Sequence, residues 1–134
     1  MKSLIVEDEF SARFFLQEVL SKYGTTHIAV NGKEAVDAVD SSLQAGEKYD
    51  LICLDIMMPE MDGQEALQKI RDMELSSGLT STKGAKIIMI TALNDMKNSV
   101  AAFWNLCDSY LVKPIDVNSL YDQLRDFQLI PEKE

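Results

Sequence analysis

The stretch from Leu51 to Pro59 limits the possible folds more than any other part of the chain. It reads Leu-Ile-Cys-Leu-Asp-Ile-Met-Met-Pro, so an unbroken apolar run ends at Asp55. A short apolar run of this kind, bounded by a turn, is typical of a strand that is buried on both faces. Such strands occupy the middle of parallel sheets covered by helices, and these sheets bind ligands at the carboxyl ends of their strands. The stretch therefore predicts an α/β fold with Asp55 at the ligand-binding edge.

The rest of the chain alternates between strand-like and helical segments. We expect strands at residues 2–6, 25–30, 51–54, 86–90 and 109–112, and helices at residues 10–23, 33–43, 64–73, 94–106 and 117–127. Five strands alternating with five helices predict a flavodoxin-like, doubly wound parallel sheet in the order 2-1-3-4-5, which places the partly polar second strand at an edge. One domain over residues 1–130 and a short tail at 131–134 are expected.

The overall charge restricts the class of partner. The formal net charge is −9, which argues against a nucleic-acid surface because phosphates would be repelled. No apolar stretch approaches the length needed to span a membrane, and no charged segment precedes an apolar one as in a signal peptide. The sequence predicts a cytoplasmic protein without direct contact to nucleic acid or a membrane.

Residues suited to phosphate chemistry follow four of the five expected strands. Glu7 and Asp8 follow the first strand, Asp55 the third, Thr91 the fourth and Lys113 the fifth. In the expected order the first and third strands are neighbours, so three carboxylates should converge. A hard divalent cation relieves their mutual repulsion, and oxygen ligands suit Mg²⁺. We expect Lys113 and Thr91 on the far side of Asp55, where a cation and a hydroxyl donor complete a site for a phosphoryl group.

Each of these residues also has an ordinary structural explanation. Asp8 can cap a helix, Thr91 can end a strand, and Lys113 can be a surface cation. Four separate strand ends that all carry the residue types required for the same chemistry are much harder to reach by accident. The combination therefore favours a phosphoryl site with Mg²⁺ as its cofactor.

Four stretches of the chain carry a resemblance to a known family. They are Leu4–Glu9, Asp55–Gly63, Thr91-Ala92 and Tyr110–Pro114. With these stretches, the chain resembles the receiver domains of two-component response regulators, in their stand-alone, single-domain form. The resemblance extends from Met1 to about residue 130.

The resemblance implies a role for each site residue. Asp55 would be the phospho-acceptor. Asp8 and Asp55 would bind Mg²⁺ directly, Glu7 would bind it through water, and Met57 would offer its backbone carbonyl. Thr91 and Lys113 would hold phosphoryl oxygens, so that Asp55, Lys113 and Thr91 form the catalytic set. Thr91 and Tyr110 would form the switch that responds to phosphorylation.

Other functions on a similar sheet fit the sequence less well. An aspartyl-phosphate phosphatase needs a second Asp at the position of Met57. A flavin-binding electron carrier needs a Ser/Thr/Gly-rich loop where Glu7-Asp8-Glu9 stands, and a nucleotide hydrolase needs a P-loop, which the sequence lacks. A receiver fold that serves only as a docking module stays open. We expect a protein that catalyses its own phosphorylation and dephosphorylation and no other reaction.

The implied partners are a sensor histidine kinase or a histidine phosphotransfer protein, and a downstream protein target. Because no output domain follows in the sequence, the signal is expected to pass by protein contact or onward phosphorelay. Phe10 and Phe14 lie one helical turn apart and off the apolar stripe of the first helix, which predicts an exposed pair. The resemblance extends a docking role to Phe10, Ser11 and Phe14. In the alternative, Phe10 folds back over the Met-rich loop that follows Asp55, and only Phe14 is exposed.

Overall fold

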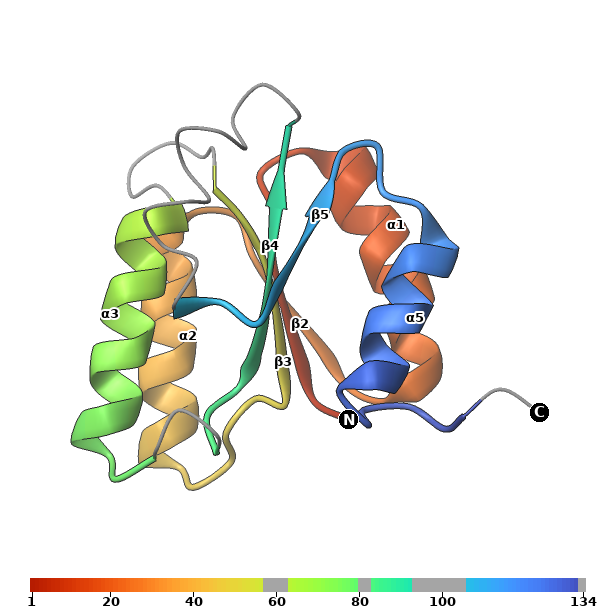
Figure 1. Ribbon diagram of the computed structural model, residues 1–134. Helices are drawn as coiled ribbons and strands as arrows, with labels where there is room; N and C mark the ends of the chain where they lie inside the picture. Colours follow the sequence, from red (N-terminus) through yellow and green to blue (C-terminus); the bar gives the residue numbers. More distant parts are fainter. Residues whose placement is uncertain (57–62, 80–82, 93–105, 133–134) are drawn as a thin grey trace.

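A five-stranded parallel sheet lies between two pairs of helices. The computed structural model describes residues 1–56, 63–79, 83–92 and 106–132. The strands, in the spatial order β2-β1-β3-β4-β5, are β1 (Ser3–Val6), β2 (Thr26–Ala29), β3 (Leu51–Asp55), β4 (Lys86–Thr91) and β5 (Ser109–Val112). Helices α1 (Phe10–Leu20) and α5 (Val117–Asp126) cover one face, and α2 (Gly32–Gln44) and α3 (Gly63–Ser76) cover the other (Figure 1). The predicted fold class and strand order are confirmed.

The described residues contain four α-helices, whereas the sequence predicted five. The missing one was expected at residues 94–106, and nearly all of it lies outside the described ranges, so it stays a prediction. Within those ranges, no helix combines the length and apolar character required to cross a bilayer.

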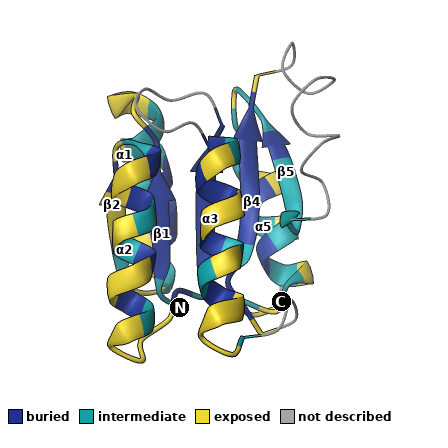
Figure 2. Ribbon diagram, turned by 90° about the vertical axis from the view of Figure 1, so that its left-hand side faces the viewer, coloured by how far each residue is buried: buried dark blue, intermediate teal, exposed yellow. Residues whose placement is uncertain are grey.

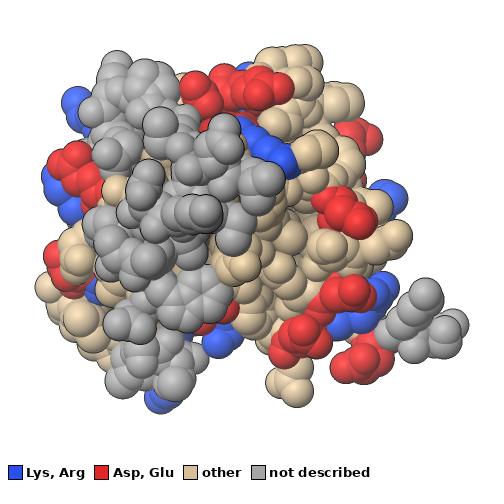
Figure 3. Space-filling view, turned by 45° about the horizontal axis from the view of Figure 1, so that its top comes forward, with Lys and Arg blue, Asp and Glu red and all other residues tan. Residues whose placement is uncertain are grey.

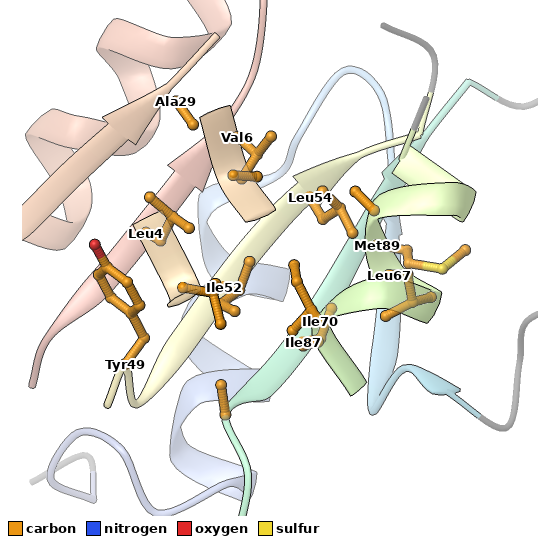
Figure 4. Packing of buried hydrophobic residues seen from close by; sticks show 14 of the residues in the cluster. Leu4, Val6, Ala29, Tyr49, Ile52, Leu54, Leu67, Ile70, Ile87 and Met89 are labelled. Carbon is orange, nitrogen blue, oxygen red and sulfur yellow. The ribbon is translucent and has the colours of Figure 1, made fainter. Parts of the chain in front are cut away.

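The central strands bury both of their faces, as their unbroken apolar sequences predicted. Leu4 and Val6 of β1 point into the cluster beneath α2 and α3 (Figure 4), while Ile5 between them points into the cluster beneath α1 and α5. Figure 2 shows the buried strands behind helices whose outer faces are exposed. At the sheet edge, β2 leaves His27 and Ile28 exposed. This pattern fixes the register, because a slip by one residue would exchange the two faces.

Two helix boundaries differ from the prediction for identifiable reasons. The regular part of α1 ends at Leu20, and a 3-10 turn continues to Tyr23 before Gly24, whose φ of 147° favours glycine. Helix α3 runs to Ser76 rather than Met73, because the buried Glu74 in its last turn has strong partners. Its carboxylate accepts hydrogen bonds from the Arg71 guanidinium at 2.7 Å and from the backbone N–H of Ala85 at 2.7 Å.

Gly63 allows α3 to begin directly against the end of β3. A Cβ atom at this position would lie 2.4 Å from the carbonyl oxygen of Asp55 and 2.4 Å from the Cα of Ile56. The N–H of Gly63 also donates to the carbonyl of Ile56 at 3.1 Å. The residue therefore sets how closely the helix approaches the backbone that carries Asp55.

The core extends past the last helix. Ile130 is buried in the cluster beneath α1 and α5, where Phe127 and Leu129 are also packed. The chain turns toward this position at Gln128, which has a φ of 62°. Ile130 is the last buried side chain among the described residues, and the domain boundary at residue 130 stays a prediction.

Candidate functional site

Three carboxylates converge where β1 and β3 end. Val6 and Leu54 are paired in the sheet, so the residues that follow them emerge side by side. One oxygen from each of Glu7, Asp8 and Asp55 can be chosen such that the three lie within 4.8 Å of one another. Glu7 and Asp55 are buried, whereas Asp8 is exposed. Figure 3, which looks toward this end of the molecule, shows acidic side chains next to basic ones.

Lys113 lies between the two buried acids. Its Nζ is 2.9 Å from Oε1 of Glu7 and 3.2 Å from Oδ2 of Asp55. The sequence placed Lys113 on the far side of Asp55, but the long side chain reaches back to the acid that follows β1. The peptide bond between Lys113 and Pro114 is cis, and the N–H of Lys113 donates to the carbonyl of Thr91 at 2.8 Å. This last hydrogen bond joins the ends of β4 and β5.

The pKa values of Glu7 and Lys113 are both raised in this site. Burial, together with the neighbouring carboxyl group of Asp55, raises the pKa of Glu7 to about 8. Burial opposes the charge of Lys113, but hydrogen bonding and attraction to Glu7 and Asp55 outweigh it and raise the pKa of Lys113. The lysine therefore stays positively charged at neutral pH, while Glu7 holds a proton for much of the time.

Thr91 and Tyr110 lie on the β4–β5 side of the site. Thr91 is buried at the last position of β4, and its hydroxyl donates to the carbonyl of Ala92 at 3.1 Å. Tyr110 is partly buried in β5 and packs against the cluster beneath α2 and α3. Tyr110 of β5 pairs with Met89 of β4, and the next pair along these strands is Leu111 with Ile90. The two residues are thus on the adjacent strands β4 and β5, and their role as a switch stays a prediction.

Met57 is the one predicted site residue outside the described ranges. Its backbone carbonyl as a metal ligand therefore stays a prediction.

The predicted aromatic pair is exposed. Phe10 is 68% and Phe14 is 51% exposed, and their rings stack with centroids 6.0 Å apart. The alternative, in which Phe10 folds back and is covered, is therefore wrong. Ser11 faces a hollow of about 500 Å³ that Phe15 and Lys113 also line. The pair and the hollow both lie at the start of α1, near the acids.

Two residues that support the site escaped the sequence interpretation. Gly63 was assigned only to a turn, and its contact with the backbone of Asp55 depends on the approach of α3. Arg13 had no part in the sequence interpretation, yet its guanidinium reaches back to the loop that carries Glu7 and Asp8. The only signal in the sequence was a cation one turn into a helix that follows three consecutive acids.

The donor set fits Mg²⁺. Three carboxylates supply hard oxygen ligands, and the exposed side of Asp8 leaves room for water, which Mg²⁺ retains in most protein sites. No histidine or thiolate is part of the cluster, as softer metals would prefer.

Comparison with known proteins identifies the family of this chain. The family model of the response regulator receiver domain matches residues 3–125. The response regulator ArlR of Staphylococcus aureus is 34% identical over 123 residues, which cover 91% of this chain and 50% of ArlR. The chain thus spans about half the length of the curated relatives it matches.

Solved structures agree with this assignment. The receiver domain of the histidine kinase CKI1 from Arabidopsis thaliana, complexed with Mg²⁺ and BeF₃⁻, has a TM-score of 0.80 at 28% identity and covers 95% of this chain and 89% of that one. The co-crystal structure of the Saccharomyces cerevisiae histidine phosphotransfer protein Ypd1 and the receiver domain of Ssk1 has a TM-score of 0.79 at 28% identity. The match covers 100% of this chain and 94% of that one. The chain belongs to the family of response regulator receiver domains of two-component signalling.

Proposed function

We propose that this chain is a phosphorylation-dependent switch in which Asp55 accepts a phosphoryl group from a phosphohistidine of a sensor kinase or phosphotransfer protein. The observation that carries the proposal is the convergence of Glu7, Asp8 and Asp55 around the Lys113 ammonium group. The CKI1 receiver with Mg²⁺ and BeF₃⁻ and the complex of Ypd1 with Ssk1 support the cofactor and the class of donor.

Asp8 and Asp55 would hold Mg²⁺ directly, Glu7 through water, and Met57 through its carbonyl. When bound, the cation supplies positive charge that lowers the repulsion between a carboxylate and an anionic phosphoryl group. Asp55 is buried at the end of a central strand, so its direction is fixed by the sheet and by the contact of Gly63 with its backbone. A fixed nucleophile avoids much of the entropy lost on alignment.

In the transfer, an oxygen of Asp55 forms a bond to phosphorus while the bond from phosphorus to the histidine nitrogen breaks. The imidazole leaves with the electron pair and takes up a proton. Lys113, already 3.2 Å from Oδ2 of Asp55, stabilises negative charge on the phosphoryl oxygens. Attack of water on the phosphorus of the acyl phosphate later returns Asp55 to its carboxylate.

Thr91 and Tyr110 would pass the change of state to the surface. Among the described residues, the Thr91 hydroxyl donates to a local acceptor, the carbonyl of Ala92, and a phosphoryl oxygen on Asp55 would be a stronger alternative acceptor. Its rotation would vacate space that Tyr110 fills. The output follows as a contact with a downstream protein or as onward phosphorelay.

We expect the protein to take up phosphate from acetyl phosphate only when Mg²⁺ or Mn²⁺ is present. The reason is that the converging acids repel the donor until a cation neutralises them. Intact-mass spectrometry with the cation, and again after addition of EDTA, measures this directly. Equal uptake in EDTA would exclude the metal-assisted mechanism, and no uptake under either condition would favour a docking module that no longer accepts phosphate.

The stacked pair Phe10 and Phe14 is proposed as part of the surface that binds the phosphohistidine protein, together with Ser11. We expect Phe14→Ala to slow transfer from the cognate donor about tenfold, because removal of a buried interface aromatic costs 1 kcal/mol or more. Labelling by acetyl phosphate and the melting temperature should change little, since Phe14 is 51% exposed.

Leu75→Ala is a matched control for that variant. Leu75 is a large apolar residue in the last turn of α3, and it is 64% exposed. This variant should leave both phosphorylation rates unchanged. A Phe14→Ala protein that loses acetyl phosphate labelling to the same degree would place Phe14 in the chemistry or the core instead of the docking surface.

A further inference from the structure

We propose that Arg13 is a positioning residue for the Mg²⁺ site: its guanidinium fixes the turn that presents Glu7 and Asp8. The inference rests on the proposed function, because it assigns Arg13 a role in binding the cation that phosphoryl acceptance requires. Arg13 lies in the first turns of α1, and its own side chain touches neither Asp55 nor Lys113 in any contact recorded among the described residues.

The turn from Glu7 to Glu9 needs such support. It carries three successive acidic residues directly before a helix. A side chain at the start of a helix usually binds the free backbone N–H groups, but Glu9 at this position makes no side-chain cap hydrogen bond. Its carboxylate accepts a hydrogen bond from the Ser11 hydroxyl at 2.8 Å instead. The backbone that carries the acids is thus not held by a helix cap.

Arg13 supplies the missing attachment from inside the helix. Its Nη1 donates to the carbonyl of Glu7 at 3.2 Å and, with a longer contact, to the carbonyl of Asp8 at 3.4 Å. The guanidinium also lies over the ring of Phe10, 5.5 Å from its centroid. Both accepting carbonyls belong to the acid pair, so their orientation and the direction of the attached side chains are fixed together.

Asp8 depends most on this contact. Glu7 is buried and its Oε1 lies 2.9 Å from Nζ of Lys113, so it has a second restraint. Asp8 is exposed, so its carboxylate lacks the restraint that burial gives Glu7. Partners that orient a metal ligand without touching the metal contribute substantially to affinity.

The charge of Arg13 and its hydrogen bonds have opposite effects on the affinity for Mg²⁺. A nearby positive charge repels Mg²⁺, so deletion of the charge alone would tighten binding. Deletion of the two hydrogen bonds would weaken it. The sign of the change in Mg²⁺ affinity therefore distinguishes a positioning role from a purely electrostatic one.

The test is titration of the full chain with Mg²⁺ alone, followed by calorimetry and by the amide chemical shifts of the acid-bearing turn. We expect Arg13→Met to raise the Kd about tenfold, within the range found for partners that orient metal ligands. Arg13→Lys should have an intermediate Kd, because an ammonium group keeps the charge but lacks the fork of the guanidinium. Lys22→Met removes one exposed charge in the 3-10 turn that follows α1 and should leave the Kd unchanged.

An unchanged or lower Kd for Mg²⁺ in Arg13→Met would overturn the inference. If Arg13→Met binds Mg²⁺ more tightly while Arg13→Lys binds it as the wild type does, the effect of Arg13 is purely electrostatic. A lower melting temperature with an unchanged Kd would also overturn it, since the role would then be only structural. The Asp8→Asn variant distinguishes failure of the proposed function from failure of the inference about Arg13. If the wild type fails to bind Mg²⁺, or if Asp8→Asn binds equally well, the proposed function fails and this inference with it.

Discussion

We expect the Asp55→Asn variant to take up no phosphoryl group from acetyl phosphate under conditions in which the wild type is labelled. The amide nitrogen and oxygen of asparagine are poor nucleophiles, and the substitution also removes one of the three converging carboxylates. Asn has nearly the same shape, so the fold is expected to persist. Intact-mass spectrometry over a time course measures the loss.

Asp122→Asn is the matched control for this experiment. Asp122 lies on α5 with a side chain that is 75% exposed and pairs only loosely with Arg125, at 3.6 Å. This variant should be labelled as the wild type is. Labelling of Asp55→Asn to the same stoichiometry would show that another residue accepts the phosphoryl group.

The second large effect that we expect is a fall in the free energy of unfolding with rising pH, caused by Glu7. The pKa of Glu7 is raised from 4.5 to about 8 in the folded protein by burial and by the neighbouring Asp55. Between these values the folded state binds more protons at this group than the unfolded state does. Glu7 therefore stabilises the fold least at high pH, and its contribution declines by at most about 1.4 kcal/mol per pH unit across this window.

Urea unfolding of the wild type and of Glu7→Gln, each from pH 5 to pH 8 without metal, isolates this contribution. The difference between the two proteins cancels the titration of groups that do not interact with Glu7. We expect the wild type to lose stability relative to Glu7→Gln as the pH rises. Saturating Mg²⁺ should reduce this loss, because the cation binds ionised carboxylates. A difference that stays constant over the pH range would show that Glu7 ionises at its ordinary pKa.

The strand pattern was sufficient to predict the sheet and the convergence of acids. Unbroken apolar runs identified β3 and β4, and the ends of these runs placed Asp55 and Thr91 at one edge of the sheet. The start of α5 also follows from local sequence, because the Asp116 side chain accepts a hydrogen bond from the N–H of Asn118, as is typical of a residue that caps a helix. These features depend on residues near one another in the sequence or on the sheet order.

Features that depend on the reach of a long side chain were not predictable. Lys113 crosses to Glu7, Arg13 bends back toward the preceding loop, and Arg71 holds the buried Glu74. A hydropathy pattern assigns all of these charges to the surface, because it contains no information on which opposite charge lies nearby in space. Their partners are set by tertiary packing, so only the folded chain reveals them.

The burial of Ile130 bears on how this receiver can be joined to other proteins. The part recognised as the family ends at residue 125, yet the hydrophobic cluster under α1 and α5 closes with Ile130. A shortened chain that ended at 125 would lose this side chain together with Phe127 and Leu129, and would expose apolar surface on α5. In a chimaera or a fusion, the foreign segment therefore has to start after Ile130, so the smallest transferable unit is longer than the family boundary indicates.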